Sequence, residues 1–272
     1  MKVDVVDRSE LSVKFVLRDC GVAFTNTLRR IMLSEVPTMA INEVVVLNNT
    51  SPIYDEVLAH RLSLIPLKTD LDRFNFPEEC SCGGAGCPKC QVTLVLDAKA
   101  EDSHRTVYSR ELSSSDPFVV PVNGNFPIAK LANGNAILLE AYARLGRGKD
   151  GAKWQPVSAC AYKYFPRIIV DSELCTGCGE CVNACPKGVL SLDGDGKLPV
   201  LKDPLNCSLC KSCVDVCPVE GAIKLDPDDT SFIFYVESTS SLPIDRIVEE
   251  AADILSEKCD MLINEFSGGE EA

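Results

Sequence analysis

The most restrictive feature of this sequence is a cysteine-rich segment of twelve residues that occurs twice. It runs from Cys175 to Pro186 and again from Cys207 to Pro218, each time with the spacing C-x2-C-x2-C-x3-C-P. These two copies contain eight of the fifteen cysteines of the chain. The N-terminal segment MKVDVVDRSE has no apolar run typical of a signal peptide, so we expect the thiols to be reduced. Clustered cysteines in a reducing compartment are expected to be metal ligands.

The spacing is that of bacterial ferredoxins with two [4Fe–4S] clusters, in which the fourth cysteine of each copy ligates the other cluster. The predicted ligands are Cys175, Cys178, Cys181 and Cys217 for cluster 1, and Cys207, Cys210, Cys213 and Cys185 for cluster 2. Two zinc sites, or copies without metal, are the alternatives. A small module has little core, so clusters that stabilise the fold and clusters that carry electrons or sense redox state are equal alternatives.

Short apolar segments flank both copies and predict a ferredoxin-like module over residues 167–226. Strands are expected at Arg167–Val170, Gly188–Leu192, Leu198–Leu201 and Gly221–Leu225. Phe165-Pro166 and the segment Asp226–Asp229 have the composition of loops and are expected to bound the module.

A third cysteine group lies in the segment from Cys80 to Cys90. Cys80, Cys82, Cys87 and Cys90 offer four thiolates, and the intervening glycines allow the loop to fold back on itself. Four protein ligands leave no open position, so the group predicts a structural zinc ion. An unmetallated loop, iron or a disulfide are the alternatives. The isolated Cys20, Cys160 and Cys259 are expected to be small buried apolar residues.

Outside the module, apolar periodicity predicts further helices and strands. Strands are expected at Val3–Val5, Ser12–Leu17, Ala40–Leu47, Gln91–Asp97, Ile137–Tyr142 and Phe232–Glu237, and helices at Ala23–Glu35, Asp55–Leu62 and from Pro243 to a stop at Gly268-Gly269. The last strand and helix cannot bury a core by themselves. We therefore expect them to pack on the N-terminal segment, in a discontinuous domain whose C-terminal amphipathic helix serves dimerisation.

Composition and motifs exclude several classes of function. The net charge of −13 disfavours an extended nucleic-acid surface, and no apolar run is long enough to span a membrane. Phosphate-binding, dinucleotide-binding and nucleophile-elbow motifs are missing from the sequence, and neither His60 nor His104 is near a cysteine group. No active site is expected in this chain, and its expected location is the cytoplasm.

Two further segments resemble a known family. Residues Asn26–Ile41 resemble the helix-and-strand signature of the α-type assembly subunits of multisubunit RNA polymerases, and His60–Leu67 resembles a second signature of that family. The Cys80–Cys90 loop is similar to the zinc loop of the third-largest subunit of eukaryotic RNA polymerase II. A ferredoxin-like insertion is a mark of the archaeal members of the family.

The resemblance implies an α+β fold with a discontinuous dimerisation domain (residues 1–50 and 227–272), an inserted mixed α/β domain (51–166) and the ferredoxin-like domain (167–226). It implies a heterodimer with the small subunit L, followed by docking of subunits N and P and of the large catalytic subunits. Its expected interface residues are Leu28, Arg29, Arg30, Ile31, Ile247, Ala251, Ile254 and Leu255. The alternative function is a ferredoxin-domain electron-transfer protein or oxidoreductase subunit.

Overall fold

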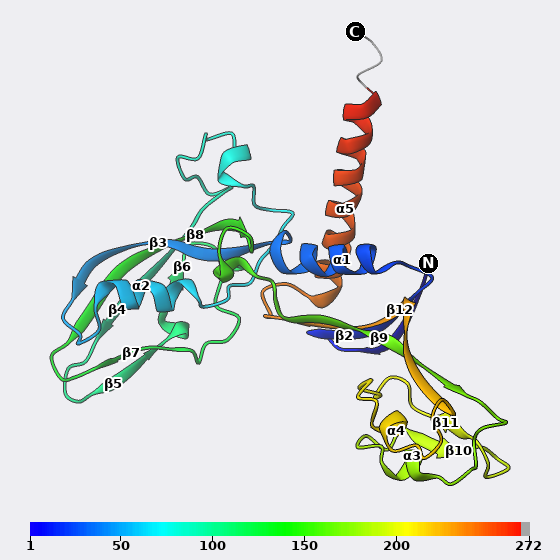
Figure 1. The fold of residues 1–272 in the computed structure, drawn as a ribbon. Coiled ribbons are helices and arrows are strands. Elements are labelled where there is room, and N and C mark those ends of the chain that lie inside the picture. Colours follow the sequence, from blue (N-terminus) through cyan, green and yellow to red (C-terminus); the bar gives the residue numbers. More distant parts are fainter. Residues whose placement is uncertain (268–272) are drawn as a thin grey trace. The chain divides into compact units, whose positions relative to one another are not determined.

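A computed structural model describes residues 1–267 of the chain (Figure 1). These residues form two compact units, the first comprising residues 1–8, 13–26 and 161–235 and the second residues 9–12, 27–160 and 236–267. The predicted helix stop at Gly268-Gly269 lies outside the described residues. No helix among residues 1–267 combines the length and apolar character needed to cross a membrane.

The first unit is built on a four-stranded sheet with the order β1-β2-β12-β9. Its strands are β1 (Lys2–Arg8), β2 (Ser12–Arg18), β9 (Val157–Val170) and β12 (Ile223–Ser238), whose last residues belong to the second unit. On one face of the sheet, the Phe15 and Phe234 rings stack with centroids 5.0 Å apart, and Tyr162 lies 5.4 Å from Phe234. This aromatic layer holds the sheet together because stacked rings bury large apolar areas.

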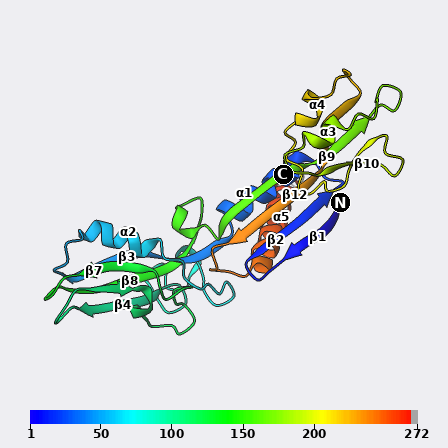
Figure 2. The ribbon, with the colours of Figure 1, turned by 90° about the horizontal axis from the view of Figure 1, so that it is seen from below.

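The duplicated cysteine segments lie in the same unit, between β9 and β12. They contain the short helices α3 (Glu180–Asn183) and α4 (Ser212–Asp215). The antiparallel pair of β10 (Leu190–Leu192) and β11 (Pro199–Leu201) lies between the two segments. Figure 1 shows these four elements close together, and Figure 2 shows the same for α3, α4 and β10. The amide of Asp171 donates to the carbonyl of Ala222 at 2.9 Å, which joins the two ends of the insertion. The strands predicted here are confirmed, with shorter bounds at β10 and β11.

The prediction of loops at Phe165-Pro166 and Asp226–Asp229 is wrong. Both segments lie inside long strands, because β9 continues through Pro166 and β12 continues through Pro227. Strand β9 is at the edge of the sheet, where a proline without an amide hydrogen costs no internal ladder bond. Asp228 uses its carboxylate to accept hydrogen bonds from the Thr230 amide and hydroxyl at 3.0 and 2.7 Å, so its polarity is satisfied locally.

The second unit contains a sheet of order β3-β8-β4-β6 and a separate pair of β5 and β7. The strands are β3 (Pro37–Asn49), β4 (Val92–Lys99), β5 (Arg105–Tyr108), β6 (Ser113–Ser114), β7 (Pro127–Leu131) and β8 (Ala136–Arg147), and every pairing is antiparallel. Helix α2 (Asp55–Ser63) inserts Leu58 and Leu62 into the core beside Leu94 and Leu139. The short helices η1 (Pro77–Glu79), η2 (Ser109–Glu111) and η3 (Ala152–Trp154) occur in its loops. The helix and strands predicted for this region are confirmed, and the mixture agrees with an α+β fold.

Two longer helices, α1 (Val22–Ser34) and α5 (Ile244–Ser267), agree with the predicted bounds to within one or two residues over the described chain. In α5, Ile244, Ile247 and Ala251 are buried, whereas every residue from Ser256 to Ser267 is exposed. An ion pair between Lys258 and Glu35 ties this helix to the end of α1. More than two turns of α5 therefore extend from the second unit without contacts that bury them.

Candidate metal centres

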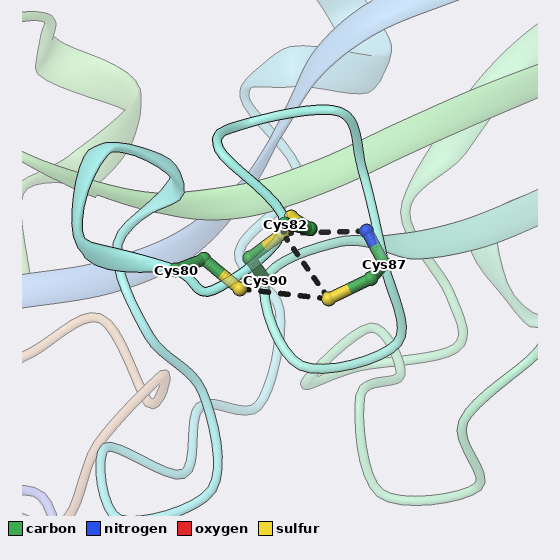
Figure 3. Close-up of side chains that lie close together, drawn as sticks. All are labelled: Cys80, Cys82, Cys87 and Cys90. Carbon is green, nitrogen blue, oxygen red and sulfur yellow. Dashed lines mark hydrogen bonds between the residues drawn. The ribbon is translucent and has the colours of Figure 1, made fainter.

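The loop between η1 and β4 brings the thiols of Cys80, Cys82, Cys87 and Cys90 together (Figure 3). Two tight turns shape it, in which the Gly83 amide donates to the Cys80 carbonyl and the Cys90 amide donates to the Cys87 carbonyl, both at 2.9 Å. Gly83 and Gly86 have φ angles of 64° and 86°, a backbone conformation that glycine adopts without steric cost. The glycines noted in the sequence are thus the positions at which the chain reverses.

The sulfur positions fit a single tetrahedral ion. All four ligand atoms lie within 4.8 Å of one another. Sγ of Cys80 lies 3.5 Å from that of Cys87, and Sγ of Cys90 lies 3.5 Å from that of Cys82 and 3.9 Å from that of Cys87. Tetrahedral bonds of about 2.3 Å to zinc would place sulfurs about 3.8 Å apart. The group could therefore hold a metal ion, and it leaves no ligand position open for substrate.

The surroundings of Cys82 and Cys90 shift the pKa values of these two thiols in opposite directions. Hydrogen bonds from Cys80 and Cys90 lower the pKa of Cys82 to about 6, whereas burial raises the pKa of Cys90 to about 12. A bound divalent cation would favour the thiolate form of all four. Metal binding at this loop is consequently expected to release protons.

The eight cysteines of the repeat line two separate cavities in the first unit. Cys175, Cys178, Cys181 and Cys217 line a cavity of about 380 Å³, and Cys185, Cys207, Cys210 and Cys213 line one of about 350 Å³. Each cavity thus receives three cysteines from one copy and the fourth from the other. These are the two ligand sets that the ferredoxin spacing predicts; their role as cluster ligands stays a prediction.

The two copies fold alike around their cavities. The third cysteine of each, Cys181 and Cys213, lies on a short helix and is at most 8% exposed. Burial raises the pKa of both thiols. Apolar residues, among them Leu190 and Leu225 at one cavity and Ile223 at the other, complete the walls. Hollows walled by four thiols and apolar side chains fit a multi-atom cluster, which is larger than one ion and needs shielding from water.

The same backbone conformation recurs in both copies with different residues. In the first copy Gly177 and Gly179 have φ angles of 69° and 76°, and at the equivalent positions Leu209 and Lys211 have φ angles of 55° and 65°. A left-handed conformation costs a non-glycine residue about 1–2 kcal/mol. The second copy therefore adopts this loop against the preference of its own residues.

The predicted interface residues divide into two groups. Leu28, Ile31, Ile247 and Ala251 are at most 7% exposed in the single chain, and their interface role stays a prediction. Arg29, Ile254 and Leu255 are half-buried and Arg30 is exposed. For these four residues the interface role stays a prediction.

The exposed apolar residues of α5 lie further along the helix than the sequence prediction placed them. Met261, Leu262, Ile263 and Phe266 are 59–79% exposed. The helical apolar pattern that includes Leu255 and Leu262 continues to Phe266, which is the signal that would have identified them. Cys259, expected to be buried, is also exposed on this helix, and Cys20 and Cys160 are half-buried.

Comparison with known proteins gives the class of the chain. The model of the RNA polymerase Rpb3/Rpb11 dimerisation domain matches residues 14–259. The chain belongs to this family of RNA polymerase subunits.

Several archaeal proteins are similar to the chain over almost its whole length. It is 43% identical over 264 residues to DNA-directed RNA polymerase subunit Rpo3 of Methanosarcina acetivorans, with 97% of both chains covered. It is 43% identical to Rpo3 of Archaeoglobus fulgidus, with 95% of both covered, and 41% identical to Rpo3 of Methanothermobacter thermautotrophicus over 99% of this chain and 100% of the relative. The resemblance to the archaeal α-type polymerase subunits is thereby confirmed.

Proposed function

We propose that the chain is a non-catalytic assembly subunit of a DNA-dependent RNA polymerase, which pairs with a small partner subunit in the cytoplasm. The observation that carries this proposal is the exposed end of α5, with its large apolar residues, in a chain whose family is defined by a dimerisation domain. Exposed apolar groups of this size are typical of surfaces that another chain covers. The expected partner is subunit L, and the pair would then recruit subunits N and P and the large catalytic subunits.

The partner surface would centre on Leu262 and Phe266, which are one helical turn apart. Both are more than half exposed, whereas the first turns of α5 already pack within the second unit. Burial of a leucine or phenylalanine side chain contributes about 1.5–3 kcal/mol. Loss of both contacts would therefore weaken the heterodimer by two to four orders of magnitude.

Co-expression with the small subunit tests this proposal. The variant Leu262→Glu/Phe266→Glu is expected to lose the partner in affinity purification. Asn264→Glu is the matched control, because Asn264 lies on the opposite side of the same exposed helical segment. Retention of the partner by the double variant would contradict a pairing surface on α5.

We further propose that the Cys80–Cys90 loop holds a structural zinc ion. The sulfur separations and the closed set of four thiols support this choice. The ion would fix the loop that follows η1, because Cys80 and Cys90 at its two ends are at most 5% exposed.

For the repeat we propose two [4Fe–4S] clusters, held by Cys175, Cys178, Cys181 and Cys217 and by Cys207, Cys210, Cys213 and Cys185. Such clusters supply one-electron redox chemistry and also crosslink the chain. The apolar core of the module is small, with buried Leu190, Ile223 and Leu225 as its larger members, so the crosslinks would contribute most of its stability. Iron, sulfide and zinc analysis of anaerobically purified heterodimer tests both metal assignments.

A further inference from the structure

An open groove in the first unit lies beside the cavity of Cys185, Cys207, Cys210 and Cys213, with which it shares Lys187 and Ser208, and none of the cysteines lines it. It has a volume of about 900 Å³ and lies between one face of the β1-β2-β12-β9 sheet and the loop around residues 205–208. Lys14 of β2, Lys163 of β9 and Ile233 and Tyr235 of β12 line it from the sheet. Lys14 is next to Phe15 in β2, and Ile233 and Tyr235 flank Phe234 in β12, so these residues occupy the face opposite the stacked Phe15 and Phe234 rings. Tyr162 of β9, whose ring lies 5.4 Å from that of Phe234, also borders the groove.

Three ammonium groups converge on this groove, because Lys187 lines it together with Lys14 and Lys163. Lys14 and Lys187 form no ion pair with any carboxylate of the described residues. In a chain with a net charge of −13, a concentration of unpaired positive charge is a local exception.

Two hydrogen bonds fix the position of the Lys163 ammonium group. Its Nζ donates to the carbonyl oxygens of Leu205 and Cys207 at 2.7 and 2.8 Å. These bonds connect strand β9 to the loop that carries the first cysteine of the second copy. Two of its three protons are thus used within the chain, which holds the ammonium group at the floor of the groove.

The remaining walls are mostly apolar, although Asn206 and Ser208 also line the groove. Ile233 is 3% exposed and lies on the floor, and the aliphatic Leu205 and the ring of Tyr235 flank it. A groove that combines cations with apolar walls differs from a site for a free inorganic anion, which would be surrounded by hydrogen-bond donors. It also differs from a nucleic-acid surface, which needs a row of cations along many phosphates.

We propose that this groove binds an acidic peptide segment of a protein partner, with carboxylates at Lys14 and Lys187 and an apolar side chain over Ile233. Charge complementarity would steer the segment to the groove, and the buried apolar contact would provide residence time. The partner would be a chain other than the small pairing subunit, because the groove does not involve α5.

The test uses the full-length heterodimer and a fluorescein-labelled peptide of glutamates with one central leucine, followed by fluorescence anisotropy. The variant Lys14→Gln/Lys187→Gln is expected to weaken binding at least tenfold, and wild-type binding is expected to weaken as salt increases. Lys163 is left in place because it supports the cysteine loop. Lys99→Gln/Lys130→Gln removes the same charge from strands of the second unit and is expected to bind as wild type.

A glutamate peptide without the leucine, inorganic phosphate and an oligothymidylate serve as competitors. Weaker competition by the leucine-free peptide supports the apolar contact. Displacement by phosphate at equal concentration, or tighter binding of the oligothymidylate to the wild type than to the lysine variant, would overturn the proposal in favour of a phosphate site. Equal binding by wild type and variant would overturn it as well. Iron and sulfide analysis of each sample separates these outcomes from loss of the clusters.

Discussion

The Cys80–Cys90 loop and the duplicated cysteine segments gather their thiols in different ways. The loop closes on itself within eleven residues and brings four sulfurs within 4.8 Å of one another. The repeat divides its eight cysteines between two cavities, and each cavity needs one thiol from the other copy. When all four ligands come from one short loop, loss of the metal is expected to disturb only that loop. When each ligand set combines cysteines from both copies, the two halves of the module depend on each other.

The largest expected change in metal content follows from the fact that each cavity takes one cysteine from the other copy. Cys217→Ser removes one ligand from the cavity of the first copy, although the residue itself belongs to the second. Because metal ligation supplies the folding free energy of a small module, we expect both halves to be lost, with bound iron falling from about eight atoms per chain toward none. Iron and sulfide analysis and limited proteolysis between residues 167 and 226 measure the effect.

Cys185→Ser is the reciprocal variant and is expected to give the same result. Cys259→Ser is the control, since Cys259 is exposed on α5 and lines neither cavity. Retention of about half the iron in either cavity variant would show that the two copies are independent, and the comparison with the zinc loop would then fail.

A change in the local loop is expected to have a smaller and confined effect. Cys90→Ser removes one of four tetrahedral ligands, so bound zinc is expected to fall from about one ion per chain to near zero. Iron content is expected to be unchanged, because none of the eight other thiols takes part in this loop. Metal analysis of the same sample for zinc and iron measures both, and a parallel loss of iron would contradict two separate centres.

A partial loss of cluster stability is expected when the contact between strand β9 and the loop of Cys207 is removed. Lys163→Met deletes the two charge-assisted bonds to the Leu205 and Cys207 carbonyls and is expected to cost about 2–3 kcal/mol of local stability. Under air the cluster held by Cys207 should then decay several-fold faster than in wild type, as followed by its visible absorbance. Lys14→Met removes a charge from the same groove without such bonds, and Lys14 does not line the cavity of Cys207, so the cluster is expected to decay at the wild-type rate.

The smallest effect concerns the left-handed residues that differ between the copies. Lys211→Gly is expected to stabilise the module by up to ~1 kcal/mol, because glycine removes the steric cost of a φ angle of 65°. Gly177→Ala at the other copy is expected to destabilise it by at least ~1 kcal/mol, since its Cβ would lie 3.0 Å from the Lys197 carbonyl oxygen. Ser208→Gly, at a position without positive φ, is the control and should be slightly destabilising. Thermal unfolding of the reconstituted protein ranks the three.

Sequence patterns predicted helices and strands well where the spacing of apolar residues within a short segment decides the structure. Amphipathic spacing predicted α1, α2 and α5, and alternation or apolar runs predicted β3, β4 and β8. The same reasoning failed at Pro166 and Asp226–Asp229, because it treated proline and aspartate as loop residues. Whether a proline breaks a strand depends on its place in the sheet, and a single sequence does not contain that information.

The sequence does not show which apolar residues the chain itself buries. Leu28, Ile31, Ile247 and Ala251 belong to an apolar stripe, and an apolar stripe looks the same in sequence whether the chain itself or a partner covers it. The basic groove was not found at all, since Lys14, Lys163 and Lys187 are far apart in the chain and become neighbours only through strand order and the returning loop.

The sequence by itself predicted how the cysteines are grouped, because the short loops between them limit which thiols can reach one metal site. It also determined the family, since the characteristic segments are continuous in the chain. Only the tertiary structure decided which apolar side chains the molecule covers with its own residues, and which lysines meet on one face of a sheet. Burial and long-range proximity depend on how distant segments pack, and packing is a property of the whole chain.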